Sequence, residues 1–215
     1  MTGATDAAHV PDAAVDSGVA ALTGDVEQVP TAVSAIKVAG RRAYDLAREG
    51  VEVELAARPV TIREFRVTGR RRPVVDGLTA VDLDVVVRCT SGTYVRALAR
   101  DLGAALGVGG HLTALRRTEV GPFSVEGAPV PERDTDVAAS LLPPVDVAAR
   151  LFPVWRMDAA QAVDLGHGKR VASGLDDTDG PVAAVTPEGR LAGLVAVRRG
   201  TAKPIVNFPS DEVAP

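Results

Sequence analysis

One continuous stretch, from Arg88 to Phe123, constrains the fold of this chain more than any other part of its 215 residues. It reads RCTSGTYVRALARDLGAALGVGGHLTALRRTEVGPF, which combines the end of an alternating strand, a polar turn, a helical repeat, a glycine turn and a basic loop. A strand that passes through a short turn into a helix indicates a sheet with helices packed on it. Tyr94 and Arg96 lie where the turn enters the helix. That position suits a site for a planar, anionic group such as a nucleotide.

The apolar pattern on both sides of the turn predicts an α+β fold. Alternation over residues 81–89 predicts a strand with one buried face. The segment RPVTIREFRV (58–67) predicts a second strand, with a bulge near Arg63 where the apolar phase shifts. Helical spacing predicts helices over residues 40–50 and 94–106, each ended by glycine.

Composition divides the chain into three parts. Residues 1–18 are rich in Ala and Asp without a clear period, which indicates a flexible or truncated lead. Residues 19–150 carry the strand and helix pattern and include the linker-like GAPVPERDTD. Residues 151–215 change to short strands, with a hairpin and one short helix. They predict a small β-rich module that is marginal alone by surface-to-volume reasoning.

Charge is distributed unevenly along the chain, although the net charge is only −4. Residues 1–29 hold five acidic residues and no Lys or Arg, and residues 121–215 hold 9 basic against 13 acidic residues. Residues 30–120 hold 15 basic against 10 acidic residues, a net of +5. A basic middle fits a localised contact with a polyanion. Ordinary solvated arginines explain it equally well.

Other features of the sequence argue against several broad classes of protein. No apolar run approaches membrane-spanning length, and the absence of Lys or Arg before Lys37 is unlike a secretory signal. The single cysteine cannot form an internal disulfide, so we expect a reducing, cytoplasmic setting. Three histidines and one cysteine form no metal-ligand spacing, so we expect no metal.

Three separated segments carry a resemblance to a known family. QVPTAVSAIKVAGRRAYDLAREG, ARPVTI and CTSGTYVRALARDLGAALGVGGHLTALRRTEVGPF resemble the bacterial TruB-type tRNA pseudouridine synthases, in the same order along the chain. The resemblance spans Gly24 to Phe123 and continues more weakly into the C-terminal module. It implies isomerisation of the T-loop uridine-55 of tRNA to pseudouridine, after the nucleotide is flipped out of its stack. It also implies the mixed sheet of that family, followed by a PUA-like RNA-binding module.

The resemblance assigns roles to single residues. Tyr94 would line the uridine pocket, Leu115 would pack against the base, and Arg96 would pair with the catalytic aspartate and keep it ionised. Lys37 matches the lysine of the family's SAxK segment, and the pair Arg116 and Arg117 would meet phosphates. By residue type alone, a half-buried ring would be the commoner explanation of Tyr94, and a structural ion pair that of Arg96. Because all three family segments occur in the right order, we favour the substrate-site roles over these structural explanations.

The nucleophilic aspartate that the resemblance requires is not found in this sequence. The family carries it in a G-H-x-G-x-L-D-P motif upstream of the SAxK segment, and only 33 residues precede Ser34. The segment SGLDDTDG at 173–180 contains a Leu-Asp pair, but its Asp- and Gly-rich composition indicates a surface turn. We therefore expect the C-terminal part of such an enzyme, which binds the substrate side of the site and is inactive by itself.

Three functions are compatible with these patterns. The first is the tRNA pseudouridine synthase, which would need no cofactor, would bind the T-arm of tRNA and would be a monomer when full length. The second is a non-catalytic tRNA- or RNA-binding protein derived from that family. The third is a structural module without an RNA role. An affinity for tRNA that falls steeply with salt would separate the first two from the third.

Overall fold

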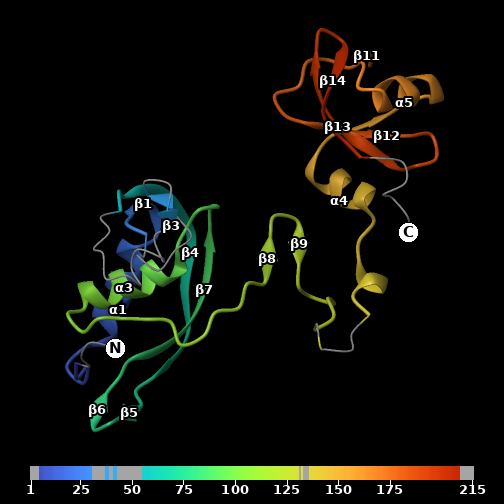
Figure 1. The fold of residues 1–215 in the computed structure, drawn as a ribbon. Helices are drawn as coiled ribbons and strands as arrows, with labels where there is room; N and C mark the ends of the chain where they lie inside the picture. Colours follow the sequence, from blue (N-terminus) through green and yellow to red (C-terminus); the bar gives the residue numbers. More distant parts are fainter. Residues whose placement is uncertain are drawn as a thin grey trace. The chain divides into compact units, whose positions relative to one another are not determined.

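The chain divides into two units, unit 1 (Met1–Leu115) and unit 2 (Arg116–Pro215). The structure, a computed structural model, describes residues 5–30, 37–38, 41–42, 55–130, 132 and 136–208. Both units combine helices with antiparallel pairing, so the predicted α+β fold is confirmed (Figure 1).

Unit 1 is built on a three-stranded antiparallel sheet with the strand order β1-β4-β7. Strand β1 spans Gly24–Gln28, β4 spans Arg58–Arg71 and β7 spans Asp82–Cys89. The pairing of β4 with β7 shifts register between Ile62 and Glu64. The two predicted strands and the predicted bulge are therefore confirmed.

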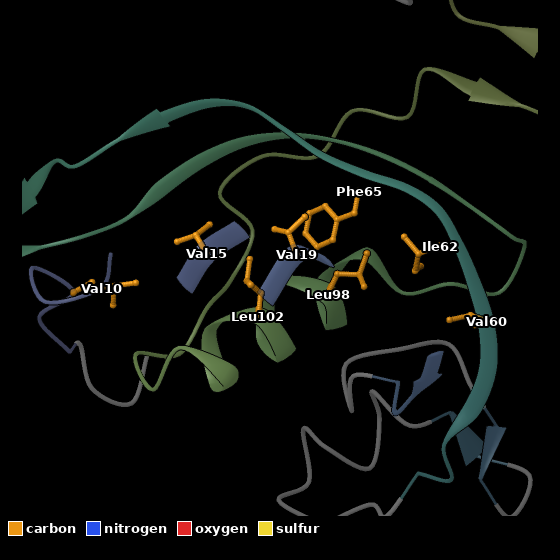
Figure 2. Close-up of a cluster of buried hydrophobic side chains, with 9 residues drawn as sticks. Val10, Val15, Val19, Val60, Ile62, Phe65, Leu98 and Leu102 are labelled. Carbon is orange, nitrogen blue, oxygen red and sulfur yellow. The ribbon is translucent and has the colours of Figure 1, made fainter. Parts of the chain in front are cut away.

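Two helices, α1 (Asp12–Ala21) and α3 (Val95–Ala105), pack on the same face of this sheet (Figure 2). Helix α3 confirms the helix predicted over 94–106. The core of unit 1 lies between the helices and the sheet and consists of Ala7, Val10, Val15, Val19, Val60, Ile62, Phe65, Leu98 and Leu102. All of these residues are buried, which fixes the position of α3 relative to β4 and β7.

Helix α1 corrects one part of the expected flexible or truncated lead over residues 1–18, namely that it is flexible. Val15 and Val19, one helical turn apart, are 0% and 8% exposed within the core of unit 1. Asp12 also pairs with the guanidinium of Arg72 at 2.6 Å. The expectation is therefore wrong for residues 12–18, which are a structural part of unit 1.

The helix predicted over 40–50 is also wrong where the structure describes it. Strand β2 (Lys37–Val38) pairs antiparallel with β3 (Arg41–Arg42), so the first residues of the predicted helix are extended. The rest of that prediction, residues 43–50, lies outside the described residues. Two further short hairpins are β5-β6 (Val74–Val75 and Leu78–Thr79) and β8-β9 (Glu119–Val120 and Phe123–Ser124).

Unit 2 holds a five-stranded sheet with the order β10-β12-β13-β14-β11. Its strands are β10 (Val154–Arg156), β11 (Val171–Ala172), β12 (Val182–Val185), β13 (Leu191–Arg198) and β14 (Thr201–Asn207). The predicted hairpin is β12-β13, and the predicted last strand is β14. Trp155, the only tryptophan of the chain, is 5% exposed in the core of this unit.

The helices of unit 2 are η1 (Ala138–Ser140), α4 (Pro144–Leu151) and α5 (Ala159–Gly166). Helix α4 packs on β12 and β13, so it belongs with unit 2, whereas the sequence placed residues up to 150 with the first domain. Across the described ranges of both units, no helix is long and apolar enough to cross a membrane.

Candidate functional site

The turn TSGTY carries the chain from β7 into α3, and its position is fixed by hydrogen bonds. The N–H of Thr90 donates to the carbonyl of Thr61 in β4 at 3.0 Å, and the Thr90 hydroxyl accepts from the N–H of Thr61 at 3.0 Å. Gly92 has a φ of +87°, which L side chains rarely adopt. The hydroxyl of Thr93 donates back to the Thr90 carbonyl at 2.9 Å. The end of the turn, Tyr94, is therefore held relative to β4.

The backbone of Tyr94, the N-cap of α3, is also held from β1. Gln28 is 3% exposed at the end of β1. Its Oε1 accepts from the N–H of Tyr94 at 2.7 Å, and its Nε2 donates to the Tyr94 carbonyl at 3.1 Å. Further along α3, the guanidinium of Arg100 donates to the Val29 carbonyl at 2.7 Å. These bonds tie the exit of β1 to the first two turns of α3.

Arg96, the second residue of α3, is exposed beside the half-buried Tyr94. Its side chain makes no hydrogen bond or ion pair with any residue that the structure describes. Helix α3 also begins without a side-chain cap and without an acidic residue in its first turn. Since a helix N-terminus carries partial positive charge, this end of α3 is electropositive and suits a carboxylate or a phosphate.

After α3, the chain folds back along the helix through the GVGG turn. A Cβ atom on Gly103 would lie 2.1 Å from the backbone of Gly109, and one on Gly110 would lie 2.2 Å from the Ala99 carbonyl oxygen. Ala99 precedes Gly103 by one helical turn, so the chain runs toward the N-terminal end of α3. Leu115 comes at the end of this return segment, 61% exposed and outside the core.

The structure therefore brings Tyr94 and Arg96 together at one helix end and leads the segment of Leu115 back toward it. For Lys37 the structure gives only the backbone, which pairs in β2. Arg116 and Arg117 begin unit 2, where both are exposed.

The arginines of the basic middle, residues 30–120, fall into two groups: those that pair with a carboxylate of the described residues and those that do not. Arg71 pairs with Asp82 and Asp84 at 2.9 and 2.6 Å, and its hydrogen bond holds the pKa of Asp84 below the ordinary value of 3.8. The hydrogen bond from Arg72 lowers the pKa of Asp12 in the same way. The basic turn after β4 is thus neutralised within unit 1. Five arginines of residues 30–120 have no such partner among the described residues: Arg58, Arg63, Arg96, Arg116 and Arg117.

Carboxylates in the described ranges do not complete the site. Asp25 accepts from the Thr61 hydroxyl at 2.6 Å on the exposed side of the β1-β4 pair. Asp176 is exposed in the loop between β11 and β12 of unit 2, which confirms the predicted surface turn. No three His, Cys, Asp or Glu side chains lie together so as to hold a metal ion in the part of the chain that the structure describes.

The sequence did not single out Gln28, Arg100 or Gly103, although all three shape the site. A glutamine at a strand end and an arginine on a helix are ordinary surface residues by type. The only available signal was the pairing of Gly103 with the following glycine cluster, since a glycine inside a helix often has a packing reason.

Family models match most of the chain. Residues 1–95 match the "TruB family pseudouridylate synthase (N terminal domain)". Residues 96–135 match the "tRNA pseudouridylate synthase B C-terminal domain", and residues 152–209 match the "tRNA Pseudouridine synthase II, C terminal". Because the N-terminal-domain model already matches residues 1–95, the expectation of a C-terminal part that lacks the catalytic segment is not confirmed.

Individual relatives agree with the family models. The tRNA pseudouridine synthase B of Leifsonia xyli subsp. xyli is 51% identical over 210 residues, which cover 96% of this chain and 68% of that protein. The corresponding protein of Streptomyces coelicolor is 50% identical over 210 residues, 97% of this chain and 69% of its own length. A crystal structure of a Cbf5-Nop10-Gar1 complex shares the fold with a TM-score of 0.60 at 19% identity, covering 93% of this chain and 62% of that one. This chain belongs to the TruB family of tRNA pseudouridine synthases.

Proposed function

We propose that this chain forms the substrate-binding side of a tRNA uridine-55 pseudouridine synthase that acts on the T-arm. The observation that carries the proposal is that Tyr94 and Arg96 lie at one end of α3, and that the Arg96 guanidinium has no partner among the residues that the structure describes. The turn before them is bonded to β4 and β1, so the two side chains start from a fixed backbone. An aromatic residue with a fixed backbone and an exposed cation two residues later suit a flipped base and its charged surroundings.

Each residue would contribute one step. The enzyme first extrudes the target nucleotide, which costs a few kcal/mol of unstacking, and the Tyr94 ring then holds the uracil. The exposed side chain of Leu115 would cover the base as an apolar wall. Arg96 would pair with the nucleophilic carboxylate, which favours its ionised form and orients it toward the nucleoside. Isomerisation of one glycosidic bond adds no group and transfers no electrons, so no cofactor is required.

The nucleophilic aspartate would come from outside these 215 residues. The sequence contains no G-H-x-G-x-L-D-P motif, and the match covers 68% of the relative from Leifsonia xyli subsp. xyli. In the described ranges, no carboxylate pairs with Arg96. The chain by itself would therefore bind substrate without converting it. As a tRNA-modifying protein, the full enzyme would work in the cytoplasm as a monomer.

Phosphate contacts would come from cations that have no partner among the described residues. Arg116 and Arg117 are exposed and follow Leu115 directly, and Arg63 is exposed at the bulge of β4. Lys37 would be a further contact by its match to the SAxK segment. Such contacts position an RNA without reading its sequence.

The binding test uses a T-arm hairpin RNA, the same hairpin with a cytidine in place of the target uridine, and heparin as a polyanion control. We expect the chain to prefer the uridine hairpin, with an affinity that falls steeply between about 50 and 200 mM salt. Tyr94→Ala should remove the preference for uridine. Equal affinity for the hairpin and heparin would refute the proposal.

The catalytic test measures pseudouridine formation by the chain alone. We expect none, and we expect turnover when a segment that carries the G-H-x-G-x-L-D-P motif is added to the chain. Turnover by the chain alone would place the nucleophile within it, and Asp25→Asn and Asp176→Asn would then locate it. Uridine-specific binding without turnover, even after the motif-carrying segment is added, would instead favour a non-catalytic tRNA-binding protein derived from the family.

A further inference from the structure

We propose that Gln28 is a positioning residue that sets the direction of the Tyr94 side chain by holding both backbone polar groups of that residue. This inference rests on the proposed function, in which the Tyr94 ring holds the flipped base. It adds a residue at the end of β1, 66 positions before Tyr94 in the sequence, that orients the Tyr94 side chain without touching the substrate.

The geometry of the contact fixes two peptide planes at once. The N–H of Tyr94 belongs to the peptide plane before its Cα, and the carbonyl belongs to the plane after it. One side chain, Gln28, binds the first group at 2.7 Å and the second at 3.1 Å. The rotations of these two planes about the bonds to the Tyr94 Cα are φ and ψ, here −101° and 98°. Once both planes are held, the direction of the Cα–Cβ bond is determined.

The N–H of Tyr94 is bonded by Gln28 alone among the described residues. The Tyr94 carbonyl is shared, because it also accepts from the N–H groups of Ala97 at 2.9 Å and Leu98 at 3.3 Å as the first acceptor of α3. The Tyr94 backbone is extended, and α3 has no side-chain cap of its own. The preceding turn contains Gly92, a residue with wide conformational freedom. Gln28 itself is well anchored, because it pairs with Arg58 across the β1-β4 sheet and is 3% exposed. The next residue, Val29, is held by Arg100 of α3 at 2.7 Å.

The contact requires a neutral group with a donor and an acceptor side by side. A primary amide offers both. Loss of the acceptor is the costlier change, because it leaves the Tyr94 N–H unpaired, whereas the Tyr94 carbonyl keeps its partners at the start of α3. Gln28→Met keeps the length of the side chain but has neither. Gln28→Glu keeps the acceptor. Its carboxylate would face the Tyr94 carbonyl without a proton to donate, whereas the protonated carboxyl restores both bonds.

A matched control exists in unit 2. Gln161 also uses its whole amide on backbone groups, accepting from the N–H of Asp158 at 2.9 Å and donating to the Ala172 carbonyl at 2.9 Å. Gln161→Met therefore removes the same two kinds of bond at a site far from Tyr94 in the sequence. We expect Gln28→Met to weaken binding of the T-arm uridine hairpin about tenfold, while Gln161→Met leaves it unchanged.

A double-mutant cycle separates positioning from a general effect on the fold. If Gln28 acts through Tyr94, the double variant Gln28→Met with Tyr94→Ala binds the hairpin no more weakly than Tyr94→Ala alone. Additive losses would overturn the proposal, because they would show that Gln28 supports binding by another route. Circular dichroism melts of each variant show whether the fold is retained.

Two further readouts follow the contact directly. Amide hydrogen exchange at Tyr94 should accelerate in Gln28→Met, and unchanged exchange would refute the contact even if RNA binding falls. In Gln28→Glu, hairpin affinity should recover as pH falls, because burial beside a carbonyl favours the protonated carboxyl. The wild-type titration corrects for the charged groups of β1 and α3 and for the residue paired with Gln28 in β4, which are Asp25, Glu27, Arg96, Arg100, Asp101 and Arg58.

The outcomes separate this inference from the proposed function. A wild-type chain that does not prefer the uridine hairpin refutes the proposed function, and the positioning role falls with it. A wild-type chain that does prefer the hairpin, together with equal binding by Gln28→Met, refutes the positioning role alone.

Discussion

Gly103 and Gly109 lie in direct backbone contact, since a Cβ atom on Gly103 would come within 2.1 Å of the Gly109 carbonyl group. The N–H groups of Val108 and Gly109 both donate to the Gly103 carbonyl at 3.0 Å. No side chain separates the glycine turn from α3. This closeness directs the chain back along the helix as far as Gly110, which lies against the Ala99 carbonyl.

Replacing Gly103 should therefore disturb unit 1 and the site together. Gly103→Ala forces the turn away from α3, and we expect a loss of about 1–3 kcal/mol in the free energy of unfolding, as for other overpacked sites. The hairpin RNA should also bind more weakly. Urea titration followed by circular dichroism measures the first effect. Gly166→Ala is the matched control, because a Cβ at that helical glycine of α5 meets nothing within 4 Å. Equal stabilities of the two variants would contradict the role of the contact.

Acid should weaken unit 1 through its arginine-paired carboxylates. Hydrogen bonds from Arg71 and Arg72 hold the pKa values of Asp84 and Asp12 below 3.8. Because the pKa is lower in the folded chain, the stabilisation is present above pH 3.8 and is lost as pH falls through the folded pKa. The pairs are exposed, so we expect a small effect. Thermal midpoints measured between pH 5 and pH 2 should fall less steeply for Asp84→Asn than for wild type. Asp179→Asn, in a loop of unit 2, should keep the wild-type slope.

Arginines that have a partner in the described part of the chain should differ in RNA binding from those that have none there. We expect Arg96→Ala to weaken hairpin binding several-fold and to reduce the slope of log affinity against log salt by about one. Arg71→Ala removes the same charge at a site where two aspartates already neutralise it, so it should change neither quantity. Arg96→Lys should keep the salt slope but not the full affinity, since lysine lacks the planar fork of donors. Fluorescence anisotropy at several salt concentrations measures the hairpin affinity and its salt slope for each variant. A larger loss for Arg71→Ala than for Arg96→Ala would contradict the prediction.

The elements with a strong local pattern could be predicted from the sequence, and those that depend on tertiary contacts could not. The bulge near Arg63 followed from a shift in the apolar phase, and α3 from its apolar spacing. Helix α1 was missed because it buries only Val15 and Val19 among alanines and aspartates, and its N-cap, Pro11, makes no side-chain cap. Its stability comes from packing on β4 and from ion pairs with arginines far along the chain, which no local window contains.

The same distinction applies to the candidate site. Tyr94 and Arg96 could be named from the sequence because they belong to one motif that joins a strand to a helix. Gln28 could not, because its function arises only when the end of β1 meets the start of α3. The separation of the arginines into paired and unpaired groups likewise required the folded positions of Asp82 and Asp84.

Unit 2 offers a stability test that its only tryptophan can report. Asp158 caps α5 in a capping box: its carboxylate accepts from the Gln161 N–H at 2.8 Å, and the Gln161 side chain accepts from the Asp158 N–H. Asp158→Ala should lower the free energy of unfolding by about 1 kcal/mol. Trp155 is buried in the same unit, so its fluorescence should show the loss as an unfolding midpoint at a lower urea concentration. Asp146→Ala is the control, because Asp146 lies in the first turn of α4 without capping it, and its loss should cost only a few tenths of a kcal/mol. Equal shifts for the two variants would show that the capping box does not stabilise unit 2.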